Sequence, residues 1–281
     1  MSNPFVPARH ATPLGRLREA WARRRHAAAR GPAHTASSAD ESHEPATVRL
    51  DFPRTDIWLA VSSGPERRWR AKACAKEPWT VEWLLNDVRA GEILYDIGAN
   101  VGAFSLIAAR HVGASVVAFE PGYANFARLC ENIQLNECAQ KVAPLPLALA
   151  ERAELVGFTY RTVEPGQSRH RLHDERWSAE ASNSHKYVQP VATMPLDRVV
   201  SDYDLPKPHH LKIDVDGAEL RVLQGARDVL RHPGLRTILI EAEASLRDAV
   251  SSLLADAGLR LRNDLRRDES GAPGYALFER C

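Results

Sequence analysis

The residues best suited to bind a ligand or carry out chemistry lie within residues 94–121. They belong to two apolar runs and the loop between them, LYDIGANVGAFS and VVAFEP. The first run ends at Asp96 and leads into a loop with Gly98 and Gly102, and the second ends at Glu120. In open α/β sheets a glycine loop lets a nucleoside ligand approach the backbone, and an acid after the next strand holds the ribose. This spacing therefore predicts a nucleoside site.

The glycine spacing also distinguishes between classes of nucleoside ligand. A dinucleotide loop reads G-x-G-x-x-G, because the backbone must approach a pyrophosphate closely. Here Asn100 and Ala103 occupy the second and third glycine positions. Asp96 stands just before the turn, where its charge would repel a pyrophosphate and would suit a cation such as the amino end of a methionine moiety. A nicotinamide oxidoreductase is therefore only a remote alternative.

A second group of acids follows the apolar run HHLKI: Asp214, Asp216 and Glu219. If the strand order reverses between the strands that end at Asp96 and at Asp214, both carboxyl ends open onto one crevice. The acids would then face the reactive part of the bound ligand, and one of them would take the proton of a substrate hydroxyl. Asp214 is the first candidate for this catalytic role, followed by Asp216 and Glu219. The alternative is structural, with Glu219 favoured by a helix dipole and Asp216 as an N-cap.

Metal chemistry has weaker support. The oxygens of the acidic group would suit Mg²⁺, but no second set of ligands is identifiable, so no metal is predicted. His170, His173 and His185 fit no standard zinc spacing, and we interpret them as solvent-exposed loop residues.

Alternating strand and helix patterns must position these residues. Strands are expected to end at Asp96 and Glu120, and further strands and helices follow in alternation, which predicts a doubly wound α/β fold with a mostly parallel sheet. Pro144 and Pro146 argue against a central place for the strand near 142–149. The other expected elements are helices over 79–89, 101–111, 122–135 and 218–230 and strands over 210–215, 237–241, 258–262 and 274–279.

Composition suggests three parts: a basic, disordered tail (1–45), an N-terminal strand extension (46–76) and a catalytic domain (77–281). The tail could alternatively dock to a nucleic acid, a membrane surface or a partner. Residues 150–187 are polar and weakly patterned, and we expect a long loop there that serves as a lid over the crevice. Arg171 and Trp177 are its candidates for substrate contact.

Charge and cysteine usage limit the function classes. The formal net charge of +1 over 281 residues gives no case for nucleic acid as the partner. No apolar run approaches the roughly 20 residues needed to span a bilayer. The four cysteines form no C-x-x-C pair, which favours free thiols and a cytoplasmic location. The oligomeric state is left open.

Seven short motifs together resemble the FkbM family of class I S-adenosylmethionine-dependent methyltransferases. They are E-P-x-T (77–80), D-I-G-A-N-x-G (96–102), F-E-P-x-x-x-N (119–125), N-I-x-L-N (132–136), M-P-L-D (194–197), K-I-D-V-D-G-A-E (212–219) and I-L-I-E (238–241). Two features depart from the family pattern. Asp216 replaces the usual glutamate, and ALAERAE (148–154) lacks the usual serine–acid pair near the adenine.

The resemblance implies a Rossmann-like fold and methylation of a hydroxyl on a sugar, glycolipid or polyketide-like metabolite. The implied cofactor-binding residues are Asp96, Gly98, Asn100, Gly102, Glu120 and Asn125. Among them, Asp96 would hold the amino group of S-adenosylmethionine by ordering the glycine loop. Glu120 would accept hydrogen bonds from the ribose hydroxyls, and Asn125 would brace the following loop. The alternative from another class is a partner subunit that binds the cofactor without catalysis.

Overall fold

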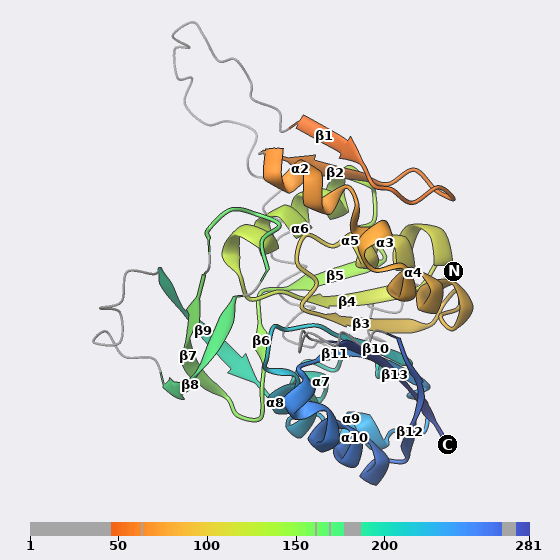
Figure 1. Ribbon diagram of the computed structural model, residues 1–281, viewed down its shortest axis with the longest axis vertical. Coiled ribbons are helices and arrows are strands. Elements are labelled where there is room, and N and C mark those ends of the chain that lie inside the picture. The colour runs from red at the N-terminus through yellow and green to blue at the C-terminus, as the bar shows by residue number, and fades with distance from the viewer. Residues whose placement is uncertain (1–45, 63, 161, 169, 177–186, 266–273) are drawn as a thin grey trace, which may run out of the picture.

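A seven-stranded sheet forms the centre of the computed structural model, which describes residues 46–62, 64–160, 162–168, 170–176, 187–265 and 274–281 (Figure 1). The strand order is β12-β13-β11-β10-β3-β4-β5. Their bounds are β3 (Ile93–Ile97), β4 (Ser115–Phe119), β5 (Val142–Leu145), β10 (His210–Ile213), β11 (Thr237–Ala242), β12 (Leu259–Asp264) and β13 (Gly274–Arg280). Strands β11 to β5 run parallel, whereas β13 and β12 pair antiparallel. The predicted doubly wound, mostly parallel sheet is confirmed.

The strand order places two chain-distant strand ends side by side. Strand β10 pairs in parallel with β3, in a register that sets Ile213 against Ile97. Strands β3 and β4 are buried along their whole length, as parallel strands covered on both faces must be. The strand order therefore reverses between β3 and β10, which was the condition for a shared crevice, and the carboxyl ends of β3, β4 and β10 share one edge. Strand β5, which contains Pro144, lies at the edge of the sheet as predicted.

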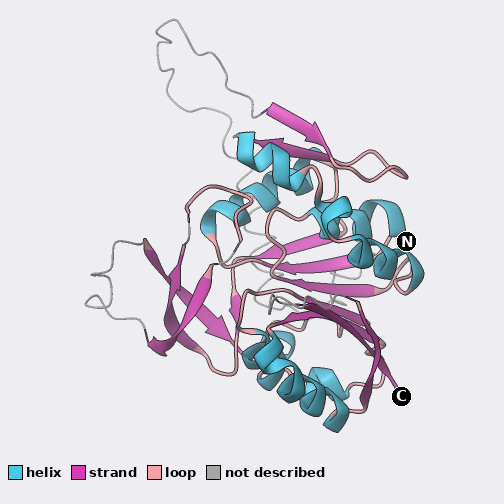
Figure 2. Cartoon of the chain, in the orientation of Figure 1, coloured by secondary structure: helices cyan, strands magenta, loops and turns pink. Residues whose placement is uncertain are grey.

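Helices cover both faces of the sheet (Figure 2). One face carries α4 (Pro78–Asn86), α5 (Ala103–Leu106) with its π-helical continuation (Ile107–Val112), and α6 (Tyr123–Leu135). The other carries α7 (Leu196–Asp202), α8 (Glu219–Gln224), α9 (Arg227–Arg231) and α10 (Arg247–Asp256), the last preceded by a short 3₁₀ turn (Ala244–Leu246). Each layer buries its own apolar cluster against the sheet. The fold is thus the three-layer arrangement that alternating strands and helices produce.

The predicted extent of one helix is wrong. The predicted helix over 218–230 is two helices, α8 and α9, separated at Gly225. A Cβ at Gly225 would lie 2.3 Å from the carbonyl oxygen of Ala150. The chain therefore bends at the point where it passes closest to the neighbouring backbone, which a helical repeat of apolar residues does not reveal.

The N-terminal extension is a hairpin followed by short helices. Strands β1 (Ala46–Arg49) and β2 (Trp58–Val61) pair antiparallel, and α2 (Gly64–Arg70) and α3 (Ala73–Lys76) lead into α4. The expected strands are confirmed, and the helices were not predicted. The boundaries proposed at residues 45 and 76 stay predictions, and the tail over 1–45 lies outside the described residues.

The expectation of a long loop over 150–187 is wrong for its described part. The segment contains β7 (Glu154–Thr159) and β8 (Arg171–Arg176). They join the flanking β6 (Ala148–Leu149) and β9 (Val188–Met194) in a second, four-stranded sheet of order β6-β9-β7-β8. Val156, Phe158 and Tyr160 alternate along the chain and bury one face of this sheet. That period of two was present in the sequence but was obscured by the surrounding polar residues. Trp177 and His185 lie outside the described residues.

Two further observations concern membrane-crossing helices and the cysteines. Among the described helices, none combines the length and the apolar character that crossing a membrane requires. All four cysteines have free thiols.

Candidate functional site

The glycine turn after β3 is held tightly against its neighbours. Gly98 and Gly102 have φ angles of +83° and +88°, and Asn100 between them also has a positive φ of 52°. A Cβ at Gly98 would lie only 1.8 Å from the carbonyl oxygen of Asp214. The glycine at position 98 is therefore required by the approach of the β10 end to the β3 end, independently of any ligand.

Glu120 joins the end of β4 to this turn. Its side chain is buried, with the backbone N–H of Gly122 donating to Oε1 at 2.8 Å and the N–H of Asn100 donating to Oε2 at 2.9 Å. Burial raises the pKa of Glu120 to about 7, although these two hydrogen bonds and the charge of Arg70 oppose the rise. An ionised carboxylate has further lone pairs, so Glu120 can still accept hydrogen bonds from ligand hydroxyls.

Asp96 supplies a buried negative charge beneath the turn. Its Oδ2 accepts a hydrogen bond from the Ser105 hydroxyl at 2.5 Å, and its Oδ1 lies 3.7 Å from the Lys212 ammonium. Among the described residues this Oδ1 has no hydrogen-bond partner. Lys212 is itself held by carboxylates, which raise its pKa despite its burial. This oxygen thus pairs with the Lys212 charge and still has capacity to accept a hydrogen bond.

Two asparagines tie residues 166–167 to the glycine turn, and we call this short segment the strap. The side-chain amides of Asn125 and Asn100 both donate to the Gln167 carbonyl, at 3.2 and 2.8 Å. Asn125 Oδ1 also accepts from the Gly166 N–H at 2.8 Å. Asn125 therefore braces a loop, as the sequence suggested, but the loop comes from the second sheet and not from the segment that follows α6.

Arg70 brings a cation into this group of acids. It extends from α2, and its Nε donates to the Gly166 carbonyl of the strap. Burial lowers the pKa of Arg70, while the charges of Glu77, Asp214 and Glu120 oppose that decrease. Sequence reasoning missed this residue, because it was only one member of a basic stretch over residues 67–72.

Asp214 lies at the centre of a second hydrogen-bonded cluster. Its Oδ2 accepts from the Tyr275 hydroxyl at 2.9 Å and from the Lys212 ammonium at 3.2 Å. The Tyr275 hydroxyl also lies 3.1 Å from Glu77 Oε2, and Glu241 is the cross-strand neighbour of Tyr275 in the β11–β13 pair. Glu77 and Glu241 belong to quoted motifs, but no role was assigned to them. No sequence signal pointed to Tyr275, whose place depends on the pairing of β13 with β11.

Glu219 and Asp216, the other two predicted catalytic acids, lie in and after the turn that leads from β10 to α8. Glu219 is buried and braces the preceding turn, because its Oε1 accepts from the N–H groups of Gly217 at 3.0 Å and Val215 at 3.4 Å. Burial raises its pKa. Asp216 has a positive φ of 55° in this turn. It is not the N-cap of α8, since that position is Ala218. The catalytic roles of Asp216 and Glu219 stay predictions.

Residues of the expected lid have definite neighbours. Arg171 is exposed and forms an ion pair with Glu243 at 3.5 Å. His170 is buried, with its ring 4.8 Å from that of Tyr160, so the expectation of a solvated histidine is wrong there. Burial lowers its pKa. Across the described ranges, no group of three or more His, Cys, Asp or Glu side chains is arranged to hold a metal ion.

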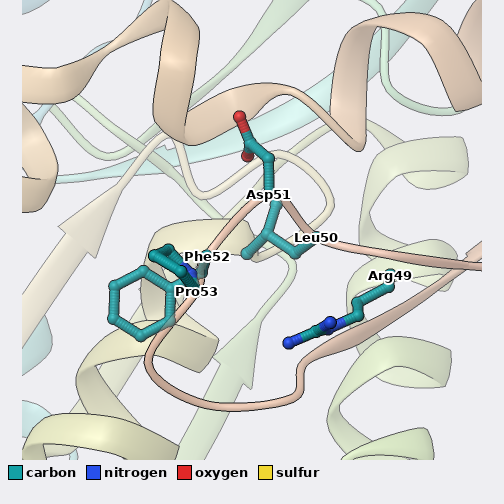
Figure 3. A pocket seen from close by; sticks show the side chains of 5 residues that line it. All are labelled: Arg49, Leu50, Asp51, Phe52 and Pro53. Atoms are coloured by element: carbon teal, nitrogen blue, oxygen red, sulfur yellow. The ribbon is translucent and has the colours of Figure 1, made fainter.

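A surface pocket lies away from these residues, in the loop after β1 (Figure 3). It is lined by Arg49, Leu50, Asp51, Phe52 and Pro53. The Asp51 carboxylate is already used, because it accepts from the N–H groups of Cys74 at 2.9 Å and Ala75 at 2.8 Å at the start of α3. None of the predicted site residues lines this pocket, so the candidate site is the edge where β3, β4 and β10 end.

Proteins similar in sequence to this chain include several methyltransferases. Hexuronic acid methyltransferase AglP of Haloferax volcanii is 30% identical over 205 residues, which span 73% of this chain and 79% of that protein. The 31-O-demethyl-FK506 methyltransferase FkbM of Streptomyces tacrolimicus is 27% identical over 186 residues, 55% of this chain and 66% of that protein. The crystal structure of methyltransferase FkbM from Methylobacillus flagellatus KT aligns with a TM-score of 0.46 at 16% identity, over 69% of this chain and 45% of that chain.

The α/β fold and the sequence relatives define the class of this protein as a methyltransferase. The model of the methyltransferase FkbM domain matches residues 96–261, and the chain belongs to that family. The resemblance seen in the motifs is thereby confirmed.

Proposed function

We propose that this protein transfers a methyl group from S-adenosylmethionine to a hydroxyl oxygen of a sugar, glycolipid or polyketide-like acceptor. The observation that carries the proposal is the coupling of Glu120 to the glycine turn through the N–H of Asn100. The names of two relatives, one a hexuronic acid methyltransferase and one acting on 31-O-demethyl-FK506, support this range of acceptors.

The residues at the edge of the sheet fit this cofactor. Glu120 has lone pairs for the ribose hydroxyls, Gly98 and Gly102 permit the tight turn beside it, and Asp96 has a carboxylate oxygen without a hydrogen-bond partner among the described residues. Asn100 and Asn125 hold the strap beside them. When bound, S-adenosylmethionine supplies a methyl group on a cationic sulfonium. The many carboxylates of the crevice favour a cation there.

The task of the protein residues is then to align the acceptor, exclude water and remove one proton. Alignment of reacting groups can lower a barrier by on the order of 7–11 kcal/mol at best. Removal of the hydroxyl proton by a carboxylate contributes roughly 10²–10⁴-fold. We place the acceptor beside the acids that follow β10, Asp214, Asp216 and Glu219, because they lie at the same edge as Glu120 and the glycine turn.

Calorimetric titration with S-adenosylhomocysteine tests the cofactor assignment. We expect the wild type to bind, Glu120→Ala to lose binding, and the exposed-helix control Glu82→Ala to bind like the wild type. NAD serves as a control ligand. A wild type that does not bind S-adenosylhomocysteine would contradict the proposal, and binding of NAD would indicate an oxidoreductase instead.

Transfer of a labelled methyl group tests the reaction. The acceptor panel contains p-nitrophenyl glucuronide, p-nitrophenyl glucoside and a macrolide alcohol. We expect alkali-stable label on at least one acceptor, as an ether requires. Label that alkali releases would indicate esterification of a carboxyl group. Cofactor binding without transfer to any acceptor would favour a non-catalytic partner subunit.

A further inference from the structure

A single phenol hydroxyl lies between two carboxyl groups that come from distant parts of the chain. The hydroxyl of Tyr275 in β13 lies 2.9 Å from Asp214 Oδ2, just after β10, and 3.1 Å from Glu77 Oε2, at the N-cap of α4. We call these three groups the carboxyl–phenol trio. Tyr275 and Glu77 are buried, whereas the Asp214 side chain is 23% exposed. Asp214 is therefore the member of the trio that an acceptor can reach.

The number of protons available decides how these contacts can form. A phenol hydroxyl has one proton to donate, and an ionised carboxylate has none. Tyr275 can therefore donate to Asp214 or to Glu77, and the other oxygen–oxygen contact needs a proton on the carboxyl group itself. Without that proton, two negative charges would lie against the same oxygen in a buried site, which is unfavourable. The contacts thus indicate that one carboxyl group of the trio holds a proton.

The neighbouring cations place the negative charge on Asp214 and the proton on Glu77. The buried ammonium of Lys212 donates to Asp214 Oδ2 at 3.2 Å. Glu77 pairs with exposed Lys76, whose ammonium lies 3.6 Å from Oε1, and solvent weakens such a pair. Burial and the charge of Asp214 raise the pKa of Glu77, and the two lysines and the tyrosine oppose this rise without reversing it.

Further charged groups surround the trio: Asp96 of β3, Glu241 of β11 and Arg70 of α2. Asp96 competes for the ammonium of Lys212, from which its Oδ1 lies 3.7 Å. Arg70 is held by the strap through the Gly166 carbonyl. Carboxyl groups thus outnumber cations around the trio, and a proton on one of them lowers their mutual repulsion.

We propose that Glu77 is a neutral acid that donates its proton to the Tyr275 oxygen, and that Tyr275, by donating in turn to Asp214, is a positioning residue for methyl transfer. This inference rests on the proposed function. Tyr275 and Lys212 both bind Oδ2 of Asp214, which leaves Oδ1 for the acceptor hydroxyl.

The proposed step moves one methyl group and one proton. The acceptor oxygen bonds to the methyl carbon as the carbon–sulfur bond breaks, and the electron pair of that bond stays on sulfur. Because the attacking oxygen gains positive charge, its proton becomes acidic enough to pass to the ionised Asp214, which later releases it to water.

Infrared difference spectroscopy tests the proton and needs no acceptor. The spectrum of the wild type minus that of Glu77→Gln at neutral pH should contain the carbonyl stretch of one buried carboxylic acid. Tyr275→Phe should move this band to higher wavenumber, since the Glu77 proton loses its acceptor. Glu82→Gln, on the exposed side of α4, is the matched control, and its difference spectrum should lack the band. A Glu77→Gln spectrum without this difference would overturn the inference.

Steady-state kinetics test the positioning role. Tyr275→Phe keeps the ring beside Trp79 and removes only the hydroxyl. With the best acceptor of the panel, we expect kcat to fall by roughly 10–100-fold at unchanged KM, because Asp214 loses a donor that orients it. Tyr203→Phe is the matched control, since Tyr203 is exposed at the C-cap of α7, and it should keep the wild-type kcat and KM.

Each variant is first shown to be folded by cooperative unfolding in urea. A wild-type kcat in Tyr275→Phe would overturn the positioning role. A raised KM at unchanged kcat would also overturn it, and would make Tyr275 part of the surface that binds the acceptor. None of these results touches the proposed function, which fails only if the wild type binds no cofactor or transfers no methyl group.

Discussion

At the scale of single residues, the candidate site is built from groups with both a structural and a chemical role. Glu120 stabilises the glycine turn through the Asn100 N–H and is the proposed ribose acceptor. Gly98 lets the end of β10 approach β3 and shapes the turn at which the cofactor is proposed to bind. Substitutions here therefore need controls that separate loss of folding from loss of binding.

Gly98→Ala should destabilise the fold severely. The new Cβ would lie 1.8 Å from the Asp214 carbonyl oxygen at a φ of +83°, so both a backbone clash and strain result. We expect a loss of about 3 kcal/mol or more in the free energy of unfolding, measured by urea denaturation. Gly91→Ala is the control, since its φ is +82° but nothing lies within 4 Å, and it should cost about 1–2 kcal/mol. Equal losses in the two variants would contradict the clash.

The affinity for S-adenosylhomocysteine should depend on pH through Glu120. Burial raises its pKa to about 7, so a growing fraction is protonated below that pH and cannot accept both ribose hydroxyl protons. We expect the affinity to fall by up to about tenfold per pH unit below 7, measured by calorimetry between pH 5.5 and 8. Glu120→Gln should bind weakly with a flat profile. A flat profile in the wild type would show that Glu120 does not titrate in this range.

At the scale of elements, several motif residues join one element to another. Asn132 of α6 and Asn136 at its C-cap hold strand β2, with their side-chain oxygens accepting from the N–H groups of Ala60 at 2.8 Å and Trp58 at 2.9 Å. Asp197 of α7 accepts from the N–H groups of Asp228 and Val229 at the start of α9. The N-I-x-L-N and M-P-L-D motifs are thus explained by packing, without any ligand.

Asn132→Ala should loosen the N-terminal hairpin. The substitution leaves the buried Ala60 N–H and Val101 carbonyl without their side-chain partner. We expect a loss of about 2–4 kcal/mol in the free energy of unfolding and faster amide hydrogen exchange in β2. The exposed Asn263→Ala should stay within about 0.5 kcal/mol of wild type. Unchanged exchange in β2 would show that the asparagine does not hold the strand.

At the scale of the whole molecule, the carboxyl ends and the amino ends of the parallel strands carry different groups of residues. The carboxyl end gathers the acids of the candidate site, whereas the opposite end holds a buried network that ties the helical layer to the sheet. There His210 hydrogen-bonds Glu92 at 2.9 Å and Thr237 at 2.7 Å, and the Trp83 indole of α4 donates to Thr237 at 2.9 Å. This network is one of the contacts that hold α4 against the sheet.

Acidification should lower global stability through His210. Burial lowers its pKa in the folded protein, although Glu92 opposes this effect, so the unfolded chain binds the proton first as the pH falls below about 6.5. The free energy of unfolding should therefore decrease by up to about 1.4 kcal/mol per pH unit in that window. Urea denaturation between pH 7.5 and 5 measures this slope. His210→Gln should show a shallower slope, and equal slopes would exclude His210 as the cause.

The sequence by itself determined the alternation of strands and helices, the turn with Gly98 and Gly102, and the acid at Glu120. These features are local, since periodicity and glycine spacing act within a few residues along the chain. The tertiary structure alone decided which distant groups meet. Tyr275 reaches Asp214 through the pairing of β13 with β11, and Arg70 reaches the acids through α2. Charge and hydrogen-bond capacity depend on such neighbours, so the protonation of the acids could not be predicted from their order in the chain.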